Sequence, residues 1–400
     1  MHRVWHNDER TATLHHGDAR YLDRIPDGHV DCIVTSPPYW GLRDYGLLAS
    51  VWGGDADCTH VWGAWSESHD EREAVSSGKS RTTDRYYGDE SRRFDGNHQK
   101  HAAGAFCARC GAWFGNLGLE PTPELYVEHM VMVFRELWRV LKPTGTVWLN
   151  LGDSYAGSGY GGWEHGEIRR GRDRVGVDHS HGKDKRTPPG LKPKDLVGIP
   201  WRVAFALQAD GWWLRSDIIW SKPNPMPESV QDRPTRAHEY LFLLTKSERY
   251  YYDSEAVKET GVSGASDRKK MTEKRDRIGG RCKDSVDPLM AVSSLTHIGQ
   301  VRSVGLPRTR NRRSVWEIAT QPYPDAHFAT YPEALVKPCI LAGSPMGGVV
   351  LDPFCGAGTT VAVANQLGRK AIGVDASMDY LELASKYVAT GKRGRWKMSG

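Results

Sequence analysis

Four consecutive residues have the types and spacing needed for chemistry on a planar amine: Ser36, Pro37, Pro38 and Tyr39. They follow residues 30–34, a short β-branched, apolar run that predicts a buried strand. Neither proline has an N–H to donate, and each restricts the residue before it, so the strand must end in a stiff, non-helical loop. In open α/β sheets ligands bind at this edge, where a carbonyl and the Ser36 hydroxyl can accept hydrogen bonds from an amino group while Tyr39 stacks on a flat ring. The alternative is a proline-rich strand exit without function.

A second stretch has the pattern of a nucleoside-binding fold. Residues 349–360 read as an apolar strand, a glycine turn and the start of a helix. Close backbone approach to a ligand and capping of the helix are provided by Gly356, Gly358, Thr359 and Thr360. About twenty residues further on, another apolar strand ends in Asp375, at the position that binds ribose hydroxyls in such folds. The phosphate-loop pattern G-x-x-x-x-G-K-[ST] does not occur, which favours a nucleoside without a polyphosphate.

Together, Ser36-Pro37-Pro38-Tyr39 and Asp352-Pro353-Phe354-Cys355-Gly356-Ala357-Gly358-Thr359 resemble the paired motifs of the DNA amino-methyltransferases, which modify cytosine N4 or adenine N6. The catalytic motif precedes the cofactor motif, as in the permuted beta group of that family. The resemblance covers roughly residues 11–55, 115–255 and 320–390. It implies an α/β fold with a Rossmann-like, circularly permuted, seven-stranded methyltransferase sheet that carries polar and basic insertions. It also implies S-adenosylmethionine as the cofactor and double-stranded DNA as the substrate.

The resemblance assigns roles to individual residues as well. For cofactor binding it implies Asp18, Thr35, Thr330, Asp352, Phe354, Gly356, Gly358, Thr359, Thr360 and Asp375. Asp18 matches the family position that contacts the adenine ring, and a helix-capping role is the alternative. Residues 327–332 match a stretch that closes over the methionine end of the cofactor. Tyr331 stands there in place of the lysine of many relatives, a departure at the position expected to bind the carboxylate.

Ser36 favours N4 of cytosine, because relatives with serine at this position mostly act on cytosine and those with aspartate mostly on adenine. The base would be flipped out of the duplex to reach the site. N6-adenine methylation is the alternative, and a protein glutamine methyltransferase, which usually has asparagine here and needs no basic insertions, is a more distant one. A non-catalytic DNA-binding protein would not need the intact motifs. Methylation at ring carbon five would need a nucleophilic cysteine after a proline, but Cys339 lies in the apolar run 335–341, where cysteine is more often part of the core.

Residues 47–114 predict an insertion, because a polar, irregular run of this length is improbable inside a compact core. Four potential metal ligands flank its centre: Cys58, His60, Cys107 and Cys110. The second cysteine pair has zinc-knuckle spacing, and four soft or borderline ligands of this kind form tetrahedral structural sites. The gap between the pairs exceeds that of common zinc motifs, so unconnected thiols are the alternative. We expect a structural zinc ion that joins the two ends of the insertion.

Two further segments are basic. The glycine-rich residues 156–194 contain nine Lys or Arg against five acids and read as a loop, and residues 256–313 contain fourteen against six. The excess of eight in the second segment is larger than the net charge of the whole chain, +5. We therefore expect residues 256–313 to contact phosphates and to recognise the target, with a solvated loop as the alternative. The residues expected to bind DNA are Arg308, Arg310, Arg312 and Arg313.

Length and composition agree with a single catalytic domain over residues 1–400 that carries these insertions, with two domains as the alternative. The odd count of seven cysteines does not suggest a disulfide framework, and no apolar run reaches transmembrane length. We expect a protein of the bacterial cytoplasm, bacterial or phage-encoded, that does not bind membranes. A cognate restriction endonuclease is a candidate partner. For the oligomeric state, a monomer and a homodimer are the two alternatives.

The expected strands are residues 11–16, 30–35, 146–151, 212–220, 240–245, 349–352 and 371–375. The catalytic strand 30–35 and the cofactor strand 349–352 should be neighbours, and strands 212–220 and 240–245 should form an antiparallel pair at the sheet edge. The expected helices are residues 19–25, 123–141, 200–209, 333–342, 360–367 and 378–389.

Overall fold

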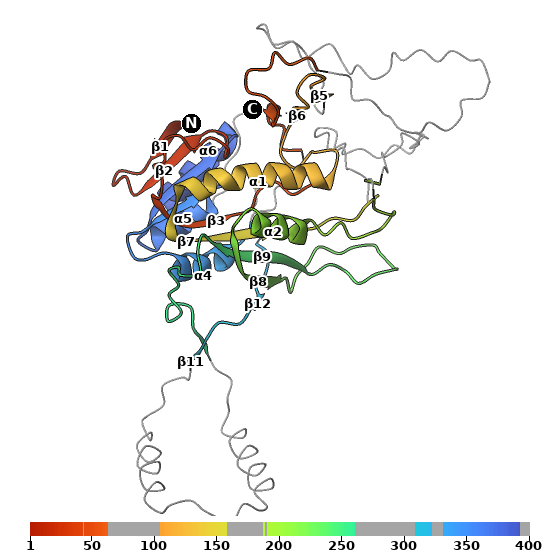
Figure 1. Ribbon diagram of the computed structural model, residues 1–400. Helices are drawn as coiled ribbons and strands as arrows, with labels where there is room; N and C mark the ends of the chain where they lie inside the picture. The colour runs from red at the N-terminus through yellow and green to blue at the C-terminus, as the bar shows by residue number, and fades with distance from the viewer. Residues whose placement is uncertain are drawn as a thin grey trace, which may run out of the picture.

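The structure is a computed structural model that describes residues 1–42, 44–62, 105–157, 187–188, 190–260, 309–321 and 331–392. Its centre is a nine-stranded mixed sheet with the strand order β1-β2-β14-β13-β3-β7-β9-β8-β12 (Figure 1). The seven expected strands are present as β2 (Ala12–His16), β3 (Val30–Thr35), β7 (Leu141–Leu151), β8 (Trp213–Ser221), β9 (His238–Thr245), β13 (Val349–Asp352) and β14 (Lys370–Asp375). The total of seven is wrong, because β1 (His2–His6) and β12 (Val315–Glu317) extend the sheet at its two ends.

The strand pairings test two expectations. The catalytic and cofactor strands are neighbours, since β13 pairs in parallel with β3 at Val350–Cys32 and Leu351–Ile33. Strands β8 and β9 are antiparallel, as expected, but the prediction that they form the sheet edge is wrong because β12 pairs in parallel outside β8. Neither end strand has a buried apolar run in the sequence: β1 is mostly exposed, and β12 has only three residues.

Helices cover both faces of the sheet (Figure 1). On one face lie α1 (Pro123–Val140) and α2 (Ile199–Ala209), and on the other lie α4 (Glu333–Gly343), α5 (Thr359–Gln366) and α6 (Met378–Thr390). Because successive side chains of a strand point to opposite faces, Ile33 packs with the α1 layer while Cys32 and Val34 pack with the α4 layer. Within the described ranges no helix combines the length and the apolar character needed to cross a bilayer.

Residues 19–25 form two turns, so the expected helix there is wrong. The amide of Tyr21 donates to the Asp18 carbonyl and that of Ile25 to the Leu22 carbonyl. The guanidinium of Arg139, on α1, donates to the carbonyls of Leu22 and Ile25, each at 3.0 Å. These long-range contacts replace the continuous helical hydrogen bonds that the local pattern favoured.

A separate three-stranded sheet is formed by the two ends of the predicted insertion 47–114 and extends to Gly115, on the α1 side of the molecule (Figure 1). It has the order β4-β6-β5, with β4 (Ser50–Trp52), β5 (Ala105–Phe106) and β6 (Trp113–Gly115). It packs on α1, where the imidazole of His129 stacks with Trp52 and Trp113 at ring-centroid distances of 4.7 and 5.3 Å. A two-stranded ribbon of β10 (Glu259–Thr260) and β11 (Thr309–Arg310) joins the two ends of the long basic segment.

Candidate functional site

The loops after β3 and β13 enclose a cavity of about 390 Å³ at the carboxyl ends of these neighbouring strands. The sequence motifs that it brings together lie more than three hundred residues apart. Nine of the predicted catalytic and cofactor residues line it: Asp18, Ser36, Pro37, Pro38, Tyr39, Phe354, Gly356, Thr359 and Asp375. The cavity therefore has the position expected for a ligand site at a break in strand order of an α/β sheet.

Four of the predicted cofactor residues stand behind the cavity wall. The buried carboxylate of Asp352 accepts from the Thr35 hydroxyl at 2.7 Å and from the Phe354 amide at 3.1 Å. Its second oxygen accepts from the Tyr331 hydroxyl at 2.7 Å. Burial raises the pKa of Asp352, although the two hydroxyls oppose that shift. The carboxylate thus fixes the ends of β3 and β13 against each other, which is a positioning role.

Thr360 and Gly358 have similar supporting positions. The Thr360 hydroxyl donates to the Val34 carbonyl at 3.2 Å and contacts the Tyr331 hydroxyl. Gly358 has a φ of +82°, and a Cβ there would stand 2.7 Å from the Cβ of Ala384 on α6. Thr330 lies outside the described residues.

Asp375 lines the cavity at the end of β14. One carboxylate oxygen accepts from the Gly356 amide and the other from the Ser377 amide, both at 2.8 Å. Burial raises the pKa of Asp375 to about 6, although these two backbone N–H groups oppose the shift. A carboxylate has about four lone-pair sites, so two remain for donors of a ligand.

Asp18 is fixed by an arginine. The Arg20 guanidinium donates to both oxygens of Asp18, at 2.5 and 3.0 Å, and lies 3.8 Å from the centre of the Trp52 ring. It also donates to the Val51 carbonyl at 2.5 Å and to the Ser50 hydroxyl at 2.9 Å. No helix begins at Asp18, so the helix-capping alternative is wrong; its carboxylate instead accepts from the Arg20 amide in a turn.

The catalytic loop contains a chain of hydrogen bonds. The Ser36 hydroxyl donates to the Tyr39 hydroxyl at 3.0 Å, which in turn lies 2.9 Å from Asn150 Oδ1 and 2.8 Å from Glu239 Oε2. The other Glu239 oxygen pairs with Lys222. Burial and the Glu239 carboxylate raise the pKa of Tyr39 well above its usual range, so this residue remains a phenol.

Sequence reasoning missed Asn150, Glu239 and the part of the cavity wall that comes from the insertion. Asn150 and Glu239 each lie in an apolar strand, at the end of that strand that faces the cavity. A polar residue at such a strand end was the available signal. The wall residues from the insertion region are Leu47, Leu48, Ser50, Trp52, Asn116 and Leu117. These residues reach the cavity because the small sheet packs on α1, a long-range contact that local sequence patterns do not predict. Cys339 is fully buried in α4, which agrees with its assignment to the core.

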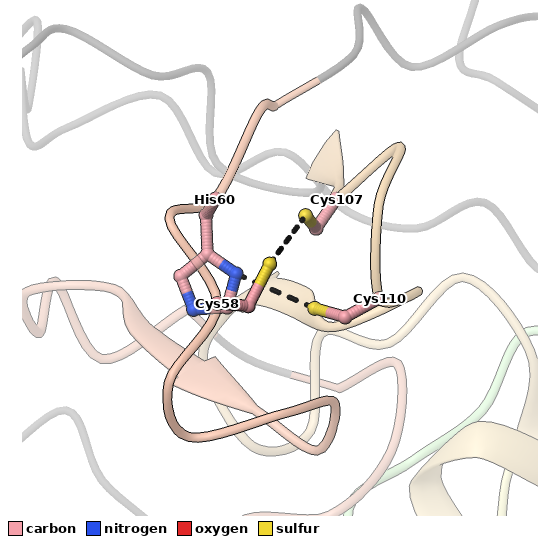
Figure 2. A group of neighbouring side chains, drawn as sticks. All are labelled: Cys58, His60, Cys107 and Cys110. Carbon is pink, nitrogen blue, oxygen red and sulfur yellow. Dashed lines mark hydrogen bonds between the residues drawn. The ribbon is translucent and has the colours of Figure 1, made fainter.

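Four predicted metal ligands converge (Figure 2). The Sγ and nitrogen atoms of Cys58, His60, Cys107 and Cys110 all lie within 4.8 Å of one another. Cys58 and Cys107 are 3.9 Å apart at sulfur, and Cys110 Sγ lies 3.4 Å from His60 Nδ1. In a tetrahedron with Zn–S of about 2.3 Å and Zn–N of about 2.0 Å these separations would be roughly 3.8 and 3.5 Å. The arrangement therefore fits one tetrahedral ion.

The predicted DNA-binding arginines within the described residues stand at the base of the basic segment. Arg310 and Arg313 both pair with Glu259, at 2.8 and 2.6 Å. The Arg312 guanidinium lies over the Trp316 ring at 4.3 Å. Arg308 lies outside the described residues. The ion pairs at the β10–β11 ribbon fix the place where the segment leaves the core.

Residues 30–386 match a family model described as DNA methylase, of the N6 and N4 type. The Type II methyltransferase M.Cfr9I of Citrobacter freundii is 38% identical over 385 residues, which cover 96% of this chain and 90% of the relative. M.SmaI of Serratia marcescens is 36% identical over 382 residues, 95% of this chain and 91% of the relative. Among solved structures, the cytosine-N4-specific PvuII DNA methyltransferase aligns with 93% of this chain and 84% of its own, at 16% identity and a TM-score of 0.45. A putative DNA modification methylase of Thermus thermophilus, complexed with S-adenosyl-L-methionine, aligns with 94% of this chain and 93% of its own, at 18% identity and a TM-score of 0.44.

Proposed function

Because the chain belongs to the N6/N4 DNA methylase family, we propose that it is a site-specific DNA methyltransferase of the permuted beta group. It would transfer a methyl group from S-adenosylmethionine to the exocyclic amine of a flipped base, N4 of cytosine. The observation that carries this proposal is the cavity that joins the Ser-Pro-Pro-Tyr loop to the glycine turn and Asp375. The catalytic strand precedes the adjacent cofactor strand in the chain, which supports the permuted order.

The residues of the cavity fit S-adenosylmethionine. Gly356 has a φ of +48°, and a Cβ added there would meet no atom within 4 Å, which leaves room for close approach of a ligand. Asp375 retains acceptor sites for ribose hydroxyls, while Asp18 and Phe354 line the same cavity. When bound, the cofactor would supply an electrophilic methyl group. The Phe354 ring and the carboxylates of Asp18 and Asp375 would orient the nucleoside of the cofactor.

Ser36 is arranged to accept a hydrogen bond from an amine. Its own proton is donated to Tyr39, so its lone pairs remain available toward the cavity. An exocyclic amine is a weak nucleophile because its lone pair is delocalised into the ring. Hydrogen bonds from its N–H groups to Ser36 and to the Pro37 carbonyl would favour a tetrahedral nitrogen with a free lone pair, after which transfer needs mainly positioning.

The same chain of hydrogen bonds offers a path for the proton that the amine loses. The proton would pass to Ser36 Oγ as the Ser36 proton moves to the Tyr39 hydroxyl and the Tyr39 proton moves to Glu239. The hydrogen bonds from Ser36 to Tyr39 and from Tyr39 to Glu239, at 3.0 and 2.8 Å, support this path. Lys222, paired with the other Glu239 oxygen, holds the carboxylate in place.

The base would stack on Tyr39. Gly152 lies against this ring, since a Cβ at Gly152 would stand 2.6 Å from a ring carbon. The ring is thereby held on the cavity wall. Extrusion of a base costs a few kcal/mol, which stacking and hydrogen bonding in the cavity would offset.

Sequencing the genome of a bacterial host that expresses the protein, with detection of methylated bases, tests the proposal. We expect N4-methylcytosine at one recurring sequence. N6-methyladenine at such a sequence would assign the alternative base. If the folded protein is produced and no DNA base gains a methyl group, the proposal fails.

We further propose that Cys58, His60, Cys107 and Cys110 hold one structural zinc ion, supported by the spacing of their ligand atoms. Metal analysis of protein never exposed to a chelator should give about one zinc per chain, and absence of zinc would end this proposal.

For the basic segment 256–313 we propose contact with DNA phosphates. We also propose that the protein acts on double-stranded DNA in the bacterial cytoplasm.

A further inference from the structure

The four-ligand cluster and the cofactor cavity share one piece of structure. We infer that the metal ion holds the small sheet β4-β6-β5 in place as a wall of the cavity, so that metal binding strengthens cofactor binding. This inference rests on the proposed zinc site and on the proposed cofactor cavity. It assigns to the metal a role in the binding site itself, in addition to joining the ends of an insertion.

The first observation is the position of the ligands relative to the wall. Cys58 and His60 follow β4, and Cys107 and Cys110 stand between β5 and β6. The wall residues lie on β4, just before β4 or directly after β6: Leu47, Leu48, Ser50, Trp52, Asn116 and Leu117. The sulfur atoms of Cys58 and Cys107 come from positions 49 residues apart. An ion that joins them therefore closes a long loop whose closure is opposed by chain entropy.

The second observation is the shortness of the strands in the small sheet. Its strands have three, two and three residues. So short a sheet is marginally stable alone and depends on what it packs against. Gly54, which has a φ of +74°, lies so close to the cluster that an added Cβ would stand 2.7 Å from Cys110 Sγ. The chain directly after β4 therefore packs closely against one of the ligand side chains.

A direct line of contacts runs from this sheet to the cavity. The Trp52 indole N–H donates to the Gly115 carbonyl at 3.1 Å and so joins β4 to β6. The Arg20 guanidinium lies on the Trp52 ring, is tied to Ser50 and Val51, and holds the Asp18 carboxylate. Loosening β4 would therefore release Arg20 and, with it, Asp18.

A second line reaches the catalytic loop. His129, between Trp52 and Trp113, contacts the buried Glu120 carboxylate at 2.9 Å. The other Glu120 oxygen accepts from the Gly118 amide at 2.8 Å, and the Gly118 carbonyl accepts from the amide of Gly41, two residues beyond Tyr39. The small sheet thus packs on the residues that anchor both sides of the cavity.

The test compares zinc-loaded and zinc-depleted full-length protein, with S-adenosylhomocysteine as the probe in calorimetry. We expect depletion to weaken probe affinity by about tenfold or more, which is about 1.4 kcal/mol, and one equivalent of zinc to restore it. Circular dichroism checks that the large sheet stays folded. Cys58→Ser should give the same loss, while Asp57→Asn, at an exposed position next to Cys58 that is not one of the four ligands, is the control.

A second variant keeps the inference testable if the cysteine variant fails to fold. Arg20→Gln should retain zinc but bind the probe more weakly, and zinc depletion should then cost it less affinity than it costs the parent. Unchanged probe affinity after verified depletion would overturn the inference while leaving the zinc site intact. A chain without zinc ends both the zinc site and the inference, and a zinc-loaded chain that does not bind the probe refutes the cofactor proposal.

Discussion

The Thr35 hydroxyl donates to the Asp352 carboxylate across 2.7 Å, although 317 positions separate the two residues in the sequence. The bond joins the last residue of the catalytic strand to the last residue of the cofactor strand. In the function that we propose, this bond would set the separation between the loop that binds the base and the loop that binds the methyl donor. The relative placement of the two strand ends is set by buried hydrogen bonds, and so it can be changed by single substitutions.

Ser36→Ala and Tyr39→Ala should each abolish methyl transfer yet leave S-adenosylhomocysteine affinity within a few fold, because we propose that both residues contact the base and not the cofactor. Tyr39→Phe keeps the ring and removes the link from Ser36 to Glu239. We expect it to retain DNA binding and to lose turnover. Loss of cofactor affinity in these variants would contradict their placement.

Asp375→Ala should weaken cofactor binding by roughly 1–3 kcal/mol, because ribose hydroxyls would lose their acceptor. Calorimetry with the folded variant measures this directly. Equal affinity in the variant and the parent would mean that the carboxylate only organises the glycine turn through Gly356.

Cofactor affinity should fall as the pH drops through about 6. Burial raises the pKa of Asp375 to about 6, so this carboxylate is ionised at pH 8 and becomes protonated below that value. Protonation removes acceptor capacity, and the affinity should fall by up to about tenfold for each further pH unit. Asp375→Asn should bind weakly with a flat profile between pH 5 and 8, and a profile parallel to that of the parent would assign the effect to another group.

Tyr331→Phe should destabilise the fold by about 1–3 kcal/mol, since the buried Asp352 carboxylate loses one of its donors. Urea unfolding measures the change. Tyr21→Phe is the matched control, because Tyr21 is 61% exposed and its loss of a hydroxyl should have little effect. Equal stabilities would show that Tyr331 does not support the strand ends.

Replacement of Arg308, Arg310, Arg312 and Arg313 by Ala should weaken binding to all DNA sequences and flatten the salt dependence, by about 0.9 in logarithmic slope for each lost phosphate contact. Because Arg310 and Arg313 also pair with Glu259, Glu259→Gln controls for disruption of the ribbon. Relaxed sequence preference at a constant slope would instead indicate contacts to base edges. If the variant binds DNA as tightly as the parent at every salt concentration, these four residues do not contact DNA phosphates.

The core and the centre of the site follow from local patterns. Thr122 and Pro123 mark the start of α1, and Thr122 indeed caps the Leu125 amide. The glycine turn and Asp375 follow buried strands, and this pattern correctly placed Gly356 and Asp375 at one cavity. Permuted motif order then predicted that β3 and β13 are neighbours.

What the sequence did not reveal depends on register and on distant packing. Glu239 reaches Tyr39 because β9 runs antiparallel to β7, with Tyr240 opposite Leu151. Nothing near residue 239 reports that pairing. The local pattern of residues 19–25 likewise predicts a helix. In the structure, the distant Arg139 side chain donates hydrogen bonds to two of their carbonyls, and no helix forms.

The strand order has a consequence for synthesis on the ribosome. Strands β2 and β3 emerge early and one after the other, but β14 and β13 lie between them in the finished sheet. Until residues 349–375 have been translated, β2 has only β1 as a native neighbour and β3 has only β7, so one edge of each strand lacks its native partner. Direct pairing of β2 with β3 would be a trap at that stage, since unpaired strand edges invite wrong partners. Release of the growing chain near residue 345 should therefore yield an aggregation-prone product, and a chaperone that shields those edges should raise the yield of active protein.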